Sequence, residues 1–133
     1  IGIREYMDKT IKDAEKQKFV ETVLGRRRNI WNVDSENHMQ REAAKRMAIN
    51  MPIQGTAAEM IKLAMLDINR TLQSEEFQSR MILQIHDELL FESPQNEIDR
   101  LEEMVKDKMI NAMPLIVPLV VDCGKGISWF DAH

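Results

Sequence analysis

Hydrophobic residues recur at intervals of three and four over residues 3–18, which predicts an amphipathic helix. The spaced positions are Tyr6, Met7, Ile11 and Ala14. Two short strands are expected next, FVETVL at 19–24 and NIWNV at 29–33. The GRRR sequence between them is most simply a solvated turn, in which Gly25 can take a positive φ.

A second pattern of the same kind predicts a long helix from about Glu36 towards Leu72, with Asp34 or Ser35 as its cap. Its expected buried stripe consists of Met39, Ala43, Met47, Met51, Ile61 and Met65. Pro52 predicts a kink near 50–55, because proline removes one backbone hydrogen bond and clashes with the preceding turn. The TAAE sequence at 56–59 fits a capping box that restarts the helix.

The rest of the chain is expected to contain a strand pair at 80–91 and an acidic helix from Pro94 to about Met113, with Ser93 as its N-cap. The apolar run at 115–123 contains Pro118 and is expected to form an edge strand or a bulge. Gly124 and Gly126 then mark a turn before Trp129. This order predicts an α+β fold, in which an antiparallel sheet with a hairpin packs against a long kinked helix and further helices.

Composition limits the class of protein. The chain has 133 residues, of which 44% are hydrophobic and 30% charged, as expected for one modest globular domain. No apolar run approaches the roughly 20 residues of a membrane-spanning helix, and the N-terminal residues lack the pattern of a signal peptide. The single cysteine, Cys123, excludes an internal disulfide framework and suits a cytoplasmic protein. The first residue is Ile1 rather than Met, which is consistent with a piece of a longer chain.

Charge is unevenly distributed, although the net charge is only −4. Residues 25–50 contain six Arg and Lys against three acids, whereas residues 84–113 contain eight acids against three bases. A basic part beside an acidic part suits a protein that contacts phosphates and also holds a divalent metal ion.

The sequence QIHDELLFE at 84–92 places His86, Asp87 and Glu88 inside an apolar run. Burying an unpaired carboxylate costs several kcal/mol, so these groups should be exposed, paired or bound to a metal. In one interpretation they are solvated residues of a tight turn between two strands. In the other, the hairpin tip presents carboxylates to a divalent cation such as Mg²⁺. The pattern alone leaves both open.

A polar stripe is expected on the long helix, because Arg46, Asn50 and Gln54 are spaced four residues apart. Arginine and amide side chains can donate to the acceptors that the DNA minor groove offers at every base pair. Arg41 and Lys45 flank the stripe and are candidates for phosphate contacts. An ordinary solvated helix face explains the stripe equally well.

Two long segments carry a resemblance to a known family. QREAAKRMAINMPIQGTAAEMIKLAM at 40–65 and QIHDELLFE at 84–92 resemble the C-terminal part of the family A DNA polymerases, the bacterial DNA polymerase I type. The second segment resembles the family's motif C, a turn with the sequence His-Asp-Glu. ETVLGRRRNI and the closing GKGISWFDAH also resemble family segments, so the similarity spans nearly the whole chain.

The resemblance implies roles for the residues of the turn and an identity for the metal. Asp87 would be the carboxylate that binds the catalytic Mg²⁺ pair, and Glu88 its auxiliary neighbour. His86 would lie near the primer terminus. Two-metal catalysis would then join a nucleotide from a dNTP to the primer 3′-hydroxyl.

The resemblance also implies contacts with primer–template DNA. Arg46, Asn50 and Gln54 would contact the minor groove and sugars near the active site, and Arg41 would lie close to the template strand. The family's second metal-binding Asp and its nucleotide-gripping helix do not match any segment of this sequence. We therefore expect residues 1–133 to be a single C-terminal palm fragment, which contains only part of the two-metal site and is inactive when isolated.

Two rival functions stay open: a DNA-binding module without chemistry, and an unrelated Mg²⁺-dependent phosphohydrolase that uses Asp87 and Glu88. The phosphohydrolase would need further carboxylates near the turn and would leave the polar stripe unexplained. We expect a bacterial cytoplasmic location and no membrane partner. Dimers or higher oligomers are expected of the fragment through the apolar stripe of the long helix or the edge at 115–123.

Overall fold

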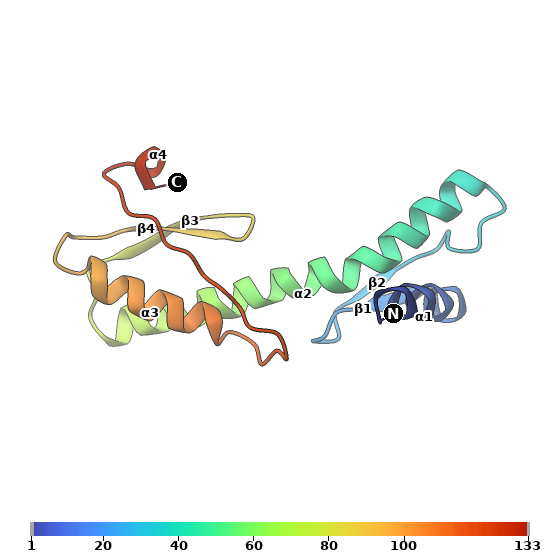
Figure 1. Ribbon diagram of the computed structural model, residues 1–133, viewed down its shortest axis with the longest axis horizontal. Coiled ribbons are helices and arrows are strands. Elements are labelled where there is room, and N and C mark those ends of the chain that lie inside the picture. The colour runs from blue at the N-terminus through green and yellow to red at the C-terminus, as the bar shows by residue number, and fades with distance from the viewer. Residues whose placement is uncertain (1, 133) are drawn as a thin grey trace. The chain divides into compact units, whose positions relative to one another are not determined.

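The computed structural model describes residues 2–132 (Figure 1). The chain forms two compact units, Ile1–Glu59 and Met60–His133, and each is described by itself. The long helix α2 (His38–Ser74) begins in the first unit and ends in the second. Helices and antiparallel hairpins alternate along the chain, which confirms the α+β fold. That residues 1–133 form a single palm fragment stays a prediction.

The first unit packs a helix and a hairpin on the first part of α2. Helix α1 (Gly2–Gln17) confirms the predicted helix, and the Tyr6 hydroxyl donates to the Ile49 carbonyl on α2 at 3.1 Å. Strands β1 (Phe19–Glu21) and β2 (Arg27–Asn29) pair in antiparallel register. The core of this unit consists of Ala14, Val20, Ile30, Val33, Ala44 and Ala48, with Met51 packed against it. A two-stranded hairpin is marginal alone, so this helix packing stabilises it.

The second strand of this hairpin was predicted too late in the chain. The strand expected at 29–33 begins at Arg27 and ends at Asn29, and 31–34 form turns. Arg27 and Arg28 are therefore strand residues rather than turn residues. The turn lies at 22–26, where Gly25 has the expected positive φ, 82°. The arginines belong to the strand because Glu21 pairs with Arg27 across the ladder and bonds its side chain at 2.5 Å.

The predicted caps of α2 were also wrong. The Asn37 side chain caps the helix, since its Oδ1 accepts from the backbone N–H groups of Met39 at 3.0 Å and Gln40 at 3.3 Å. Ser35 instead accepts from the Asn37 N–H at 3.2 Å. The carboxylate of Asp34 pairs with Lys18, and this hydrogen bond lowers the pKa of Asp34.

Helix α2 continues through Pro52 without a break. The capping box predicted at 56–59 is wrong, because Thr56 lies inside the helix and its hydroxyl donates to the Pro52 carbonyl at 2.6 Å. That hydroxyl also accepts from the Val23 N–H of the first hairpin at 3.1 Å. A bend of the helix axis at 50–55 stays a prediction.

The buried stripe of α2 is rotated from the predicted one. Ala44 and Ala48 are buried, whereas Met39 and Met47 are 79% and 40% exposed. The buried positions follow the same interval of four, one residue later along the chain. Small alanines lie inside because α1 and the first hairpin approach this part of α2 closely. Farther along, the buried apolar residues of the helix are Ala64, Ile68 and Leu72.

In the second unit, the hairpin of residues 80–92 packs against α2 and α3. This hairpin carries His86, Asp87 and Glu88 and is called the motif hairpin below. Strands β3 (Arg80–Ile85) and β4 (Glu88–Glu92) form an antiparallel pair with a register shift between Met81 and Leu83. Helix α3 (Ile98–Ile110) contributes Leu101 and Val105 to the core. That core consists of Ala64, Ile68, Leu72, Leu101 and Val105, with Phe77, Met81, Leu89 and Phe91 among the side chains packed on it. The predicted packing of the hairpin on the long helix is confirmed.

Helix α3 begins later than predicted. Residues 95–97 form a turn, so Ser93 and Pro94 precede the helix rather than cap it. The Ser93 hydroxyl lies 2.8 Å from that of Ser79 at the other strand's start. Ser93 therefore links the two strand ends of the hairpin instead of the first turn of α3.

The strand expected at 115–123 is not formed; this segment runs as irregular chain to α4 (Trp129–Ala132). Most of its apolar residues are exposed, with Ile116 at 105% and Val120 at 83%. A strand needs a hydrogen-bonding neighbour, and Pro118 removes one donor. Gly124 and Gly126 let α4 fold back closely, since a Cβ on Gly124 would lie 1.7 Å from the Ala132 carbonyl oxygen. Across residues 2–132, no helix combines the length and apolar character needed to cross a bilayer.

Candidate nucleic-acid interface and carboxylate hairpin

The motif hairpin turns through only two residues, His86 and Asp87. Ile85 pairs with Glu88 as the last rung of the ladder, so Glu88 is the first residue of β4. His86 has a φ of 52°, as two-residue hairpin loops require at their first position. Histidine enters this region more readily than most residues do. The Gln84 amide donates to the His86 carbonyl at 2.7 Å and steadies the loop.

All three ionisable residues of this loop region are exposed. The hairpin therefore places the Asp87 carboxylate at its tip in solvent, and no burial cost arises. Mg²⁺ is typically held by one or two carboxylates together with phosphate oxygens and water, and Asp87 with the adjacent Glu88 fits that donor set. Within residues 2–132, no three His, Cys, Asp or Glu side chains gather closely enough to hold a metal ion. A metal-binding role of Asp87 and Glu88 stays a prediction.

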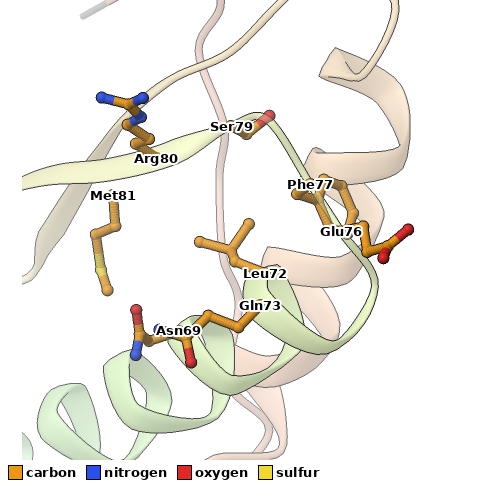
Figure 2. A pocket seen from close by; sticks show the side chains of 8 residues that line it. All are labelled: Asn69, Leu72, Gln73, Glu76, Phe77, Ser79, Arg80 and Met81. Atoms are coloured by element: carbon orange, nitrogen blue, oxygen red, sulfur yellow. The ribbon is translucent and has the colours of Figure 1, made fainter.

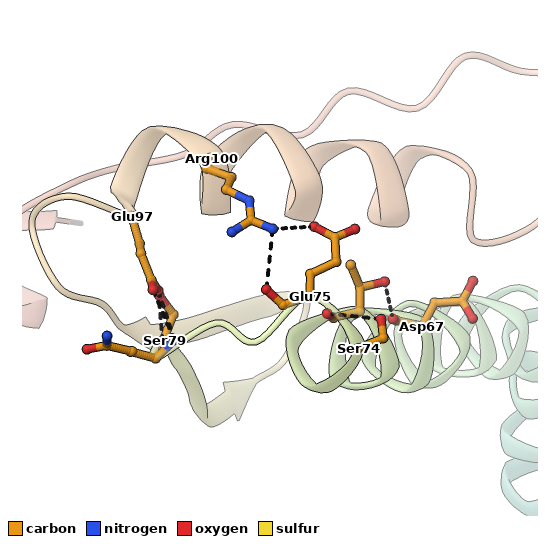
Figure 3. Close-up of polar contacts among 8 residues, drawn as sticks. Asp67, Ser74, Glu75, Ser79, Glu97 and Arg100 are labelled. Atoms are coloured by element: carbon orange, nitrogen blue, oxygen red, sulfur yellow. Dashed lines mark hydrogen bonds and ion pairs between the residues drawn. The ribbon is translucent and has the colours of Figure 1, made fainter.

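The opposite end of the motif hairpin is fixed by Glu97, which lies just before α3 (Figure 3). Its carboxylate accepts from the Ser79 hydroxyl at 2.6 Å, from the Gln78 N–H at 3.0 Å and from the Ser79 N–H at 3.0 Å. These hydrogen bonds lower the pKa of Glu97, and the bond from the Ser79 hydroxyl is the largest cause. The segment that enters β3 is thereby tied to the start of α3.

Arg100 holds the same entering segment one turn farther along α3. Its guanidinium bonds the Glu75 carboxylate at 2.6 Å and lies 4.1 Å from the centre of the Phe77 ring. Figure 3 shows Glu97 and Arg100 reaching this segment from neighbouring turns. The motif hairpin is therefore anchored at its base, while its tip extends away from these contacts.

The predicted polar stripe lies on the surface of α2 in the first unit: Arg46, Asn50 and Gln54 are all exposed. Asn50 and Gln54 line an open groove together with Arg26, Arg27 and Arg28 of the first hairpin. Met47, Met51 and Gly55 complete its lining. Arg46 is not among the lining residues. The groove therefore joins two amide side chains to an arginine cluster that the pattern of the sequence favoured as a plain turn.

Arg41 and Lys45 both have protein partners. The half-buried Arg41 donates to the Ser35 carbonyl at 2.8 Å and so ties down the chain before α2. Lys45 bonds Glu42 at 3.2 Å, which lowers the pKa of that carboxyl. A role of Arg41 beside the template strand stays a prediction.

A separate depression lies in the second unit, between the end of α2 and β3 (Figure 2). Leu72, Phe77 and Met81 line it, together with the amides Asn69 and Gln73 on α2. Figure 2 shows Arg80 and Met81 extending from opposite sides of β3. The lining does not include the hairpin tip, and we assign no chemistry to this depression.

Comparison with known proteins gives a consistent result over nearly the whole chain. The family model described as DNA polymerase family A matches residues 1–131. The DNA polymerase I of Mycobacterium bovis is 49% identical over 128 residues, which cover 96% of this chain and 14% of that protein. The DNA polymerase I of Bacillus caldotenax is 44% identical over 131 residues, covering 98% of this chain and 15% of that protein. The chain thus spans about a seventh of these relatives.

A solved structure is similar over the same extent. The POL domain of Pol1 from M. smegmatis, in complex with DNA primer-template and dNTP, superposes with a TM-score of 0.93 at 46% identity. The match covers 97% of this chain and 23% of that one.

Proposed function

Because the chain belongs to DNA polymerase family A, we propose that it is the C-terminal palm portion of a DNA-directed DNA polymerase. That enzyme would transfer nucleotides from dNTPs to the 3′-hydroxyl of a primer paired with a template. Its relatives are bacterial DNA polymerases I, and we place it in the bacterial cytoplasm. Self-association of the isolated chain stays a prediction.

The observation that carries this proposal is the motif hairpin tip. A two-residue loop, with His86 at a φ of 52°, presents the Asp87 carboxylate to solvent beside Glu88. Asp87 would hold Mg²⁺, with Glu88 as its auxiliary neighbour and His86 near the primer terminus. Bound Mg²⁺ would activate the primer hydroxyl and neutralise charge on the leaving pyrophosphate. The chain's own contribution is to place the Asp87 carboxylate on a rigid, anchored hairpin.

The α2 stripe would contact the minor groove and sugars of the primer–template duplex near the active site. Arg46, Asn50 and Gln54 are exposed donors, and the minor groove offers acceptors at every base pair whatever the sequence. Contacts of this type hold the duplex in position without distinguishing its bases. This suits an enzyme that must copy any template.

Primer extension tests the proposal in a polymerase domain where this chain replaces the matching segment of the M. smegmatis POL domain. Asp87→Ala should lower kcat at least about 100-fold, because a charge-stabilising group is lost. DNA affinity should stay within several-fold. Glu92→Ala, an exposed carboxylate on the same hairpin, is the matched control and should retain activity. Near-normal turnover of Asp87→Ala would contradict the metal role.

The incomplete donor set favours a second function for the isolated chain, that of a DNA-binding module without chemistry. The purified 133-residue chain should bind duplex DNA through the exposed donors of α2. It should incorporate no dNTP, because the family's second metal-binding Asp matches no segment of this sequence. Labelled-nucleotide incorporation by the chain alone would show that the catalytic unit is misassigned.

A further inference from the structure

The arginine loop of the first hairpin, residues 22–28, lines the same groove as the α2 amides Asn50 and Gln54. Its three arginines differ in their surroundings. Arg27 is engaged by Glu21 at 2.5 Å and lies 4.5 Å from the centre of the Phe19 ring. Among the described residues, the exposed side chains of Arg26 and Arg28 have no hydrogen-bond or ion-pair partner. Two guanidinium groups are therefore available to an external anion.

The arginine loop is seated on α2 by two adjacent residues. The Thr56 hydroxyl accepts from the Val23 N–H at 3.1 Å while it donates to the Pro52 carbonyl. At Gly55 the approach is so close that an added Cβ would lie 2.6 Å from the Thr22 Cγ2 methyl. Thr22 is buried and cannot move aside easily.

Thr22 also shapes the loop from within. Its hydroxyl accepts from the Arg26 N–H at 3.0 Å, and its carbonyl accepts from the Gly25 N–H at 2.9 Å. One side of Thr22 therefore touches the helix at Gly55, and the other fixes the backbone that carries the arginines. The position of the arginines relative to Asn50 and Gln54 follows from this pair of contacts.

We propose that the arginine loop binds the phosphate backbone of the duplex whose groove edge faces Asn50 and Gln54, and that Gly55 and Thr56 are the positioning residues that seat it. This inference rests on the proposed function. Guanidinium groups form paired, charge-assisted hydrogen bonds with phosphate oxygens. Such contacts fix the register of a protein on DNA, while the amides meet the bases.

Fluorescence anisotropy with the 133-residue chain and a labelled duplex tests the phosphate contacts across a salt series. The double variant Arg26→Ala/Arg28→Ala should bind more weakly, and its log–log salt slope should be shallower by about 1.8, since each phosphate contact contributes about 0.9. The matched control, Arg4→Ala/Lys9→Ala, removes two exposed charges from α1 of the same unit. It should leave the slope nearly unchanged.

A double-mutant cycle tests the seating. Gly55→Ala should weaken DNA binding, because its new Cβ clashes with the Thr22 methyl. Adding Thr22→Ser to that variant should recover the binding, because serine lacks the methyl but keeps the hydroxyl bonded to the Arg26 N–H. Thr56→Val should also weaken binding, and Thr56→Ser should restore it. Circular dichroism of each variant checks that the chain stays folded. The Arg26→Ala and Arg28→Ala substitutions lie on the surface and should not disturb the fold.

The outcomes separate this inference from the proposed function. Wild-type chain that binds duplex DNA, with the arginine double variant equal to it in affinity and slope, would overturn the arginine loop as a phosphate contact while leaving the polymerase assignment intact. Additive effects of Gly55→Ala and Thr22→Ser would overturn the seating role. Wild-type chain that shows no duplex binding at low salt would contradict this inference and the DNA-binding module proposed for the isolated chain.

Discussion

The two hairpins of this chain hold their loops in opposite ways. The first has strands of three residues, and its loop is held against α2 by a hydrogen bond to Thr56 and a close contact with Gly55. The motif hairpin has strands of six and five residues, a two-residue loop, and its anchor at the base, where Glu97 bonds Ser79. The loop that lies against the helix depends on tertiary contacts, and the loop that projects depends on its own backbone geometry.

This difference suits the two chemistries proposed for the loops. A phosphate contact must lie at a fixed place beside the helix that touches the same duplex, so Arg26 and Arg28 need an outside support. A metal-binding carboxylate must extend into a space shared with other groups, so Asp87 benefits from a stiff tip with open surroundings. Mutations near the first loop should therefore act through its seating, and mutations near the second should act through the hairpin base.

After the loss of at least about 100-fold predicted for Asp87→Ala in the motif hairpin, the next largest effect is expected in the groove of the first unit. Gln54→Ala in the exchanged polymerase domain should slow extension by about tenfold, the value of one or two lost hydrogen bonds. DNA affinity should change less. Gln73→Ala removes an exposed amide from the same helix outside this groove and is the control. Single-turnover kinetics and equilibrium binding separate the two effects, and equal losses for both variants would contradict a specific role of Gln54.

An intermediate effect is expected at the base of the motif hairpin. Because hydrogen bonds from Ser79 and Gln78 lower the pKa of Glu97, the ionised carboxylate stabilises the folded state above its ordinary pKa of 4.5. This stability is lost as the pH falls below that value through the lowered pKa. Glu97→Gln should be less stable than wild type at pH 7 and should lose less stability on acidification.

Thermal melts between pH 7 and pH 3 measure this effect. Glu103→Gln changes an exposed carboxylate on α3 and should follow the wild-type pH profile. A Glu97→Gln variant whose melting temperature falls with pH as steeply as wild type would show that Glu97 does not anchor the hairpin.

The smallest effect is expected where the C-terminal segment is pinned to α3. Lys125 bonds Asp99 at 2.7 Å and Glu102 at 2.6 Å, and the Lys106 and Lys125 bonds lower the pKa of Glu102 to about 2. Exposed ion pairs contribute little to stability. Lys125→Ala should shift the melting temperature by only a few degrees, with faster amide exchange in 114–128. A fall in melting temperature as large as that of Leu101→Ala in the core would contradict the view that Lys125 only tethers the segment at the surface.

The sequence predicted the position of the motif hairpin because its signals are local: two short apolar runs flank the ionisable residues of the turn. The turn was predicted one residue too long, since Glu88 pairs with Ile85 and is the first residue of β4. The first hairpin was misplaced because its strands are defined by tertiary contact: Arg27 and Arg28 are strand residues through pairing with Glu21 and Val20. No periodicity marks such residues.

The rotated stripe of α2 and the role of Thr56 were missed for a related reason. Methionine at 39 and 47 fits a buried face by hydrophobicity, but the close packing of α1 and the first hairpin selects the smaller Ala44 and Ala48. Thr56 with Glu59 three residues later matches a capping box locally. In the structure its hydroxyl instead donates to the Pro52 carbonyl and accepts from the Val23 N–H of the first hairpin. The run at 115–123 has strand character without a strand to pair with in the described part of the chain.

The central claim, that the tip of the motif hairpin holds a divalent cation, is tested most directly by adding Mn²⁺ to the isotope-labelled 133-residue chain. Mn²⁺ takes the same oxygen ligands as Mg²⁺ and broadens nearby amide signals. We predict that broadening begins at residues 85–89, disappears in Asp87→Ala and persists in Glu92→Ala. Broadening that begins elsewhere, or that is unchanged by Asp87→Ala, would contradict the claim.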